Sequence, residues 1–232
     1  MNLLRLYGDC LVKTFRVLGR SAWTLLLPMA YLALLAPIGA LLGPLGIVGG
    51  LLSSLVFTAL TASLLYVVSE LVRGAPVRLK EMPQSARHYF WPIMNVAFVF
   101  WIASFFVNPL LARAPNGAAL QIALYATLFV LFNAVPEVIY QKGEYGGIAS
   151  IMGSVKFIQE YWIEWLIPNL ALGATFWFGA QVLGRLPFAL VIVPVATGAL
   201  LLACLVFRGY LFQSLDGTGA RQRALRQRFG GR

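Results

Sequence analysis

The sequence predicts an all-α integral membrane protein with six transmembrane helices, arranged as three hairpins that each follow a cytoplasmic amphipathic helix. Three observations predict this class: the 232-residue chain is 60% hydrophobic, only 11% of it is charged, and its mean hydropathy is +0.80. A soluble domain carries roughly a quarter charged residues. A bilayer is therefore needed to cover part of the apolar surface.

Six apolar runs are long enough to cross the hydrocarbon layer, which takes about 20 residues of helix. They cover residues 21–43, 46–72, 89–112, 117–140, 163–184 and 187–213. Very short intervals with glycine or proline nearby join the first run to the second, the third to the fourth and the fifth to the sixth. Each of these pairs is therefore expected to form an antiparallel hairpin.

The distribution of basic residues predicts the orientation. Sixteen of the 18 lysines and arginines fall on one side of the predicted spans, and only Arg113 and Arg185 fall on the other. Because basic residues concentrate in cytoplasmic segments, both termini are expected in the cytoplasm. All eight acidic residues lie on the same side, so a catalytic site on the outer face is not expected.

The first twenty residues have the pattern of a helix that lies on the membrane surface. Charged residues recur at three- and four-residue spacing from Arg5 to Arg20, and apolar residues from Leu4 to Leu18 occupy another face. Such a helix turns its charges toward water and its apolar face toward lipid.

The chain has the pattern of three related units, near residues 1–73, 74–143 and 144–213, within one membrane domain over 1–215. In each unit a basic residue precedes a proline by twelve positions, with aromatic residues between them. The three pairs are Arg16 and Pro28, Lys80 and Pro92, and Lys156 and Pro168. Chance is the alternative, because membrane proteins are rich in all these features.

A few polar side chains fall within the predicted spans. Those expected at the cytoplasmic half of the bilayer are Asn95, Asn133, Glu137, Asn169 and Glu70. Polar groups at membrane depth are costly unless they are paired or face water. They could form a substrate or lipid-headgroup site, or they could only bond between helices and cap free carbonyls. Pro136 loosens the helix beside Glu137, and a solvated helix end is the expected environment of that carboxylate.

Other patterns point to packing rather than chemistry. Gly46, Gly50 and Ser54 recur every four residues, a spacing that lets another helix approach closely. The sequence contains no Walker loop, HExxH or GxSxG motif, and its single histidine, His88, is expected to be structural or to contact lipid. We therefore expect no catalytic residues, no metal and no cofactor.

A basic cytoplasmic tail covers residues 216–232. Arginines at four positions of a short helical pattern are expected to contact anionic phospholipid rather than nucleic acid: Arg221, Arg223, Arg226 and Arg228. Besides lipid, the chain could bind a protein partner or a second copy of itself.

The segment VPEVIYQKGEYGGIASIMGSVKFIQEYW, residues 135–162, resembles the corresponding region of uncharacterised bacterial six-span membrane proteins. These are the YciC-like inner-membrane proteins and the membrane regions attached to some glycerophosphodiester phosphodiesterases. The shared features are a proline-containing span, a glycine-bearing turn and an amphipathic helix with a serine near its middle, here Ser154. The resemblance implies a bacterial inner-membrane location, and it transfers no catalytic residue.

Two functions follow as hypotheses. The first is a non-enzymatic, multi-pass inner-membrane protein that organises the membrane or supports a partner complex through its interfacial helices. The second is a small transporter, channel or lipid-handling protein that uses the polar residues at the cytoplasmic side.

Overall fold

The structure, a computed structural model, describes the backbone of residues 3–185 and 188–229, and their side chains except those of residues 85, 189–191 and 218–229. It confirms the all-α class, because these residues form helices and turns and no strand. The elements in chain order are α1 (Leu3–Arg20), η1 (Ala22–Leu26), α2 (Leu27–Leu42), η2 (Gly43–Leu45), α3 (Gly46–Arg73), η3 (Leu79–Glu81), α4 (Met82–Arg113), α5 (Gly117–Phe132), α6 (Val135–Glu137), η4 (Val138–Lys142), α7 (Gly147–Leu183) and α8 (Ala189–Phe229).

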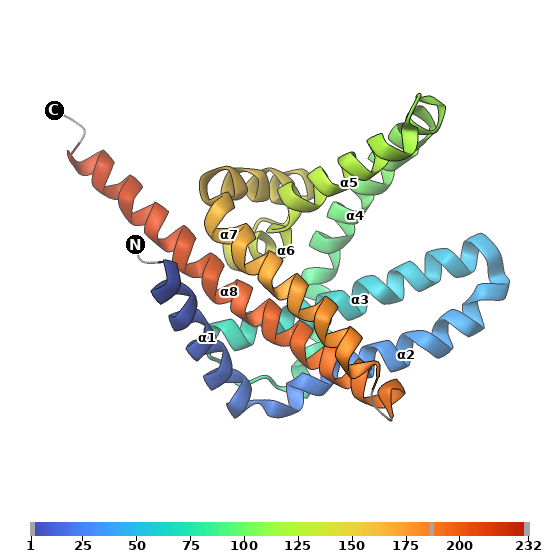
Figure 1. Cartoon of the computed structure of the whole chain (residues 1–232), viewed down its shortest axis with the longest axis horizontal. Coiled ribbons are helices and arrows are strands. Elements are labelled where there is room, and N and C mark those ends of the chain that lie inside the picture. The colour runs from blue at the N-terminus through green and yellow to red at the C-terminus, as the bar shows by residue number, and fades with distance from the viewer. Residues whose placement is uncertain (1–2, 186–187, 230–232) are drawn as a thin grey trace. The chain divides into compact units, whose positions relative to one another are not determined.

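Five helical segments among the described residues are long and apolar enough to cross a membrane. They are Ala22–Arg73, Leu79–Arg113, Gly117–Lys142, Gly147–Leu183 and Ile192–Gly217. The first has 52 residues and contains two of the predicted spans. The 3-10 turn η2 and the positive φ of Gly46, +57°, separate these two as α2 and α3, and Figure 1 shows the chain reversing between them.

The chain divides into two compact units. The first contains Met1–Pro37, Val67–Val77 and Ile163–Arg232. In it α1 packs along α8 (Figure 1), and the Trp165 ring of α7 lies edge-on to Phe212 of α8, with 6.2 Å between the ring centroids. The Tyr210 hydroxyl donates a hydrogen bond of 3.1 Å to the Leu71 carbonyl in the last turn of α3, where carbonyls have no partner within the helix.

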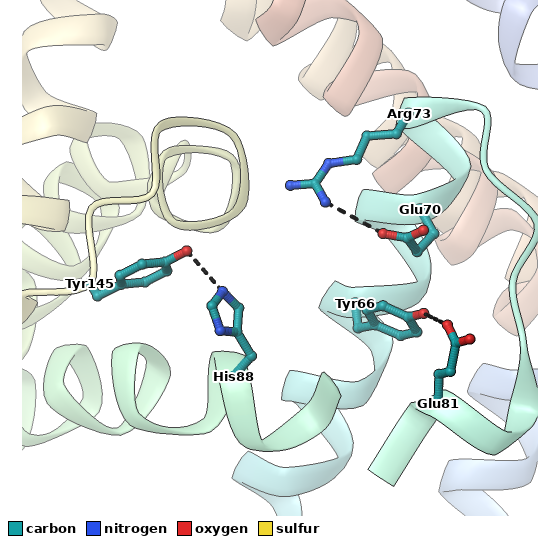
Figure 2. Close-up of polar contacts among 6 residues, drawn as sticks. All are labelled: Tyr66, Glu70, Arg73, Glu81, His88 and Tyr145. Carbon is teal, nitrogen blue, oxygen red and sulfur yellow. Dashed lines mark hydrogen bonds and ion pairs between the residues drawn. The ribbon is translucent and has the colours of Figure 1, made fainter. Parts of the chain in front are cut away.

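The second unit contains Ile38–Tyr66 and Arg78–Trp162. Here α4 and α5 pack side by side: the Phe100 and Phe132 rings are 5.1 Å apart, and Tyr125 donates a hydrogen bond of 3.0 Å to Asn108. Figure 2 shows Tyr66 of α3 donating a hydrogen bond of 3.2 Å to the Glu81 carboxylate at the end of η3.

Burial varies strongly along the helices. No residue of 97–133, which is the C-terminal half of α4 and nearly all of α5, is buried, although this stretch is strongly apolar. By contrast, almost every residue of 134–140 is buried. The second unit therefore has its packed core around residues 134–158, and most apolar side chains of 97–133 face outward.

The amphipathic segments expected before the third and fifth spans are continuous with those spans. The segment before the third span joins α4 through η3, and the one before the fifth span forms the first half of α7. A kink at Tyr161, with φ −131° and ψ 27°, divides α7 close to the expected boundary. The segment before the first span is separate, because η1 stands between α1 and α2.

Candidate functional site

The candidate site lies in the second unit, where α5 ends. We call residues 131–147 the elbow. Pro136 has no backbone N–H to donate to the Phe132 carbonyl, and α5 ends at Phe132, eight residues before the predicted end of this span at residue 140. The short helix α6 and the π-helix η4 follow, and Gly143 closes η4 with a φ of +70°. A π-helix is rare and is found frequently at functional sites.

Glu137 lies at the end of α6, and its side chain is 1% exposed. The expectation that its carboxylate lies at a solvated helix end is therefore wrong. No buried side-chain nitrogen or oxygen in the described part of the chain lacks a hydrogen-bond partner, and Glu137 takes part in a polar interaction inside the protein. The carboxylate is thus held by protein rather than by bulk water.

The first half of α7 packs against the elbow through small residues. Ser154 donates a hydrogen bond of 2.8 Å to the Leu131 carbonyl, and Ser150 donates one of 2.6 Å to the Glu144 carbonyl. Both serines are fully buried. At Gly153, an added Cβ would lie 2.7 Å from the Glu144 carboxylate and 2.8 Å from the Val138 side chain. Only glycine fits there without displacement of its neighbours.

The first half of α4 contacts the other end of the elbow. Figure 2 shows His88 pointing to Tyr145, with 2.8 Å between Nε2 and the hydroxyl oxygen. Asn95 donates a hydrogen bond of 3.4 Å to the Tyr145 carbonyl. A Cβ on Gly147 would lie 2.6 Å from the Asn95 carbonyl oxygen, so the backbones of α4 and α7 meet here.

The five residues predicted to form a polar cluster belong to both units. Asn95, Asn133 and Glu137 are in the unit that contains the elbow, and all three are at or beside it. Glu70 and Asn169 belong to the other unit. There, Glu70 pairs with Arg73 at 3.4 Å (Figure 2), and Asn169 donates a hydrogen bond of 2.6 Å to the Trp165 carbonyl of its own helix. Convergence of all five stays a prediction.

The predicted packing groove of α3 consists of Gly46, Gly50 and Ser54. Gly46 begins the helix with its positive φ, and Ser54 donates a hydrogen bond of 2.7 Å to the Leu51 carbonyl of α3 itself. A Cβ on Gly46 or Gly50 would meet no atom within 4 Å. Close packing of another helix on these glycines stays a prediction.

The four arginines predicted to contact lipid follow the apolar part of α8. The α8 backbone continues as a helix through residues 221–228. The side chains of Arg221, Arg223, Arg226 and Arg228 lie outside the described part of the structure.

In the first unit, α1 is held by polar contacts with both α7 and α8. Tyr7 donates a hydrogen bond of 3.0 Å to the Glu164 carbonyl, and burial followed by the Glu164 charge raises the pKa of its hydroxyl. Cys10 lies 4.0 Å from the Ser214 hydroxyl. Burial raises the pKa of the Cys10 thiol, although Ser214 and Lys13 oppose this increase. A thiol held in its neutral form is a poor nucleophile.

Through its contacts the elbow connects α5 with α4 and α7. The signal that sequence reasoning missed is the three- and four-residue spacing of Gly147, Ser150 and Ser154, which places small residues on one face of α7. Among the described residues, no group of three histidine, cysteine, aspartate or glutamate side chains could hold a metal ion. Comparison with protein families, with curated proteins and with solved structures finds no match for this chain.

Proposed function

We propose that this chain is a non-enzymatic, multi-pass protein of the bacterial inner membrane that organises the membrane or supports a partner complex. The observation that carries the proposal is how its polar side chains are used. Tyr7, Ser154 and Tyr210 each donate a hydrogen bond to a backbone carbonyl of another helix, at 3.0, 2.8 and 3.1 Å. Such bonds hold helices in place, which is what a scaffold requires.

The proposal includes six spans arranged as three hairpins, with both termini in the cytoplasm. The distribution of basic residues and the outward-facing apolar residues of 97–133 support it. A reporter that is active only outside the cytoplasm, inserted at residues 114–116, should be active, and the same reporter at the C-terminus should be inactive. Equal activity at both positions would overturn this topology.

A threefold repeat within this domain is also part of the proposal. Two sets of positions that are equivalent under the repeat share their burial: Leu18, Met82 and Ile158 are buried, and so are Pro28, Pro92 and Pro168. This agreement supports three related units near residues 1–73, 74–143 and 144–213, each of which begins with an amphipathic segment.

The scaffold function is tested by extracting the tagged, full-length chain together with its surrounding lipid and identifying the proteins and lipids that co-purify. A reproducible partner or an enriched lipid class, with a membrane defect after deletion, is expected. Extraction of the chain with neither, together with unchanged membranes in the deletion strain, would overturn the proposal.

One observation favours a second function, that of a small transporter, channel or lipid-handling protein. Glu137 is fully buried beside Pro136 and the π-helix η4, and ionisable residues within spans commonly mark ion and proton pathways. Proton flux through proteoliposomes that falls in Glu137→Gln and Asn133→Ala variants would support this alternative. If the wild-type chain gives a proton flux equal to that of protein-free vesicles, proton transport is excluded as the activity in this second function.

A further inference from the structure

We propose that α1 inserts one exposed face into the anionic cytoplasmic leaflet of the bilayer. This face consists of Leu4, Leu11 and Phe15, which we call the α1 ridge. The inference rests on the proposed membrane function and names the partner of one interfacial helix: a leaflet rich in anionic phospholipid.

The structure separates the apolar residues of α1 into two faces. At about 100° per residue, Cys10, Thr14 and Leu18 share one face, and all three are buried. The α1 ridge lies roughly 80° further around the helix by the same geometry, and its members are exposed, Leu4 at 81% and Phe15 at 68%. The protein covers the first face and leaves the ridge open.

Packing on α8 fixes the direction of the ridge. Cys10 meets Ser214, and the Lys13 ammonium lies 5.9 Å from the centre of the Tyr210 ring. A third contact is the hydrogen bond that Tyr7 donates to the Glu164 carbonyl of α7. Because three contacts spread over two turns hold α1, the helix cannot roll to bury its ridge against the same neighbours.

The charge of α1 favours lipid over a protein partner. The helix carries four basic residues and one acidic residue, Asp9. Arg5 and Arg16 are exposed and lie about 100–120° around the helix from the ridge. When the ridge points into the acyl chains, this angle places both side chains at the level of the lipid headgroups. Each basic residue near an anionic surface strengthens attachment roughly fivefold.

The first half of α7 also exposes apolar side chains. Phe157 and Ile158 are buried, whereas Ile148 and Met152 are exposed and share one stripe of the helix with the exposed Lys156. A second segment expected at the membrane surface therefore leaves apolar and basic side chains uncovered together, as α1 does.

Spin-label accessibility tests the inference in the full-length chain. The label is attached at Phe15→Cys, with Asp9→Cys on the charged face as the matched control and Phe105→Cys as the reference within a span. All three carry Cys10→Ala and Cys204→Ala, and unchanged melting temperatures verify their folding. Each protein is placed in nanodiscs of phosphatidylglycerol-rich lipid or of phosphatidylcholine alone.

In phosphatidylglycerol-rich discs, the label at position 15 should lose access to an aqueous nickel complex and gain access to oxygen, while the label at position 9 stays accessible to nickel. In phosphatidylcholine discs, the label at 15 should regain access to nickel. Three results would overturn the inference: nickel access at 15 in both lipids, protection at 15 without oxygen access, or spin–spin broadening that reveals a second copy. A label at position 105 that is open to nickel would instead overturn the membrane function itself.

Discussion

The hydroxyl of Ser154 donates a hydrogen bond of 2.8 Å to the backbone carbonyl of Leu131, which lies 23 residues earlier in the chain. Leu131 is in the last turn of α5, where carbonyls have no partner within the helix. The bond therefore satisfies a carbonyl at the end of α5 and ties α7 to the elbow. Ser154 also belongs to one of the three features on which the resemblance to six-span proteins rests, and that resemblance stays a prediction.

Replacing Ser154 by alanine should destabilise the protein. The change removes the side chain that donates to the Leu131 carbonyl, and an unsatisfied buried polar group costs about 1–3 kcal/mol. Thermal unfolding in detergent measures the loss. Thr175→Ala is the matched control in α7, because its exposed hydroxyl donates to the Ala171 carbonyl of its own helix. Equal melting temperatures for the two variants would contradict the role of Ser154.

Two glycines of α7 should respond to alanine in opposite directions. At Gly153 the new Cβ would press on Glu144 and on the buried Val138, and overpacking of this kind costs about 1–3 kcal/mol. At Gly173 nothing lies within 4 Å, and replacing a helical glycine there should stabilise the helix by about 0.5–1 kcal/mol. Chemical denaturation of both variants under one condition tests the pair. A stabilised Gly153→Ala variant would contradict the close contact at the elbow.

Tyr7 should make stability depend on pH in the alkaline range. Burial and the Glu164 charge raise the pKa of Tyr7 in the folded protein. The stabilisation that Tyr7 contributes is therefore complete below the pKa of tyrosine in the unfolded chain, about 10. It is lost as the pH rises through the raised pKa of the folded protein. Near neutral pH, Tyr7→Phe should cost about 0.5–1.5 kcal/mol through the lost hydrogen bond. The difference in melting temperature between wild type and Tyr7→Phe should shrink above pH 10, and a constant difference would argue against this coupling.

Cys10 should be slow to react with alkylating reagents. Its side chain is 1% exposed, and burial raises the pKa of its thiol, so little thiolate is present or accessible at neutral pH. Mass spectrometry after timed exposure to iodoacetamide measures the rate. An Arg16→Cys variant places an exposed thiol on the same helix, and it should react much faster. Similar rates would mean that the α1–α8 contact opens readily.

The sequence predicts the helical class and several helix ends, because these depend on local chemistry. The apolar runs mark the membrane-compatible helices, and the turn at Gly43–Leu45 separates α2 from α3 as glycine and proline there predict. At Pro136 the predicted loosening is observed as an interruption: α5 ends at Phe132, before the predicted end of the span at residue 140. The kink at Tyr161 falls within two residues of the predicted boundary at residue 163.

The environment of Glu137 could not be predicted in the same way. Whether a carboxylate near a helix end meets water depends on which distant segments cover it, and no local pattern contains that information. The contact of Leu131 with Ser154 joins residues 23 positions apart, and the contacts of Tyr145 with α4 join residues 57 and 50 positions apart. The π-helix η4 was not predicted either, and its first residue, Val138, lies close to Gly153, which is 15 residues further along the chain.

The uneven burial of the second unit has a consequence for how its sequence can drift. Between residues 97 and 133 no side chain is buried, so one apolar residue can replace another there with little effect on packing. From Ala134 to Ile158, small residues and hydroxyls meet specific partners, and few exchanges preserve them. A saturation library should therefore accept most apolar variants in the first stretch and reject most changes at Ser150, Gly153 and Ser154. Distant relatives of this chain would then be recognised by the elbow rather than by their spans.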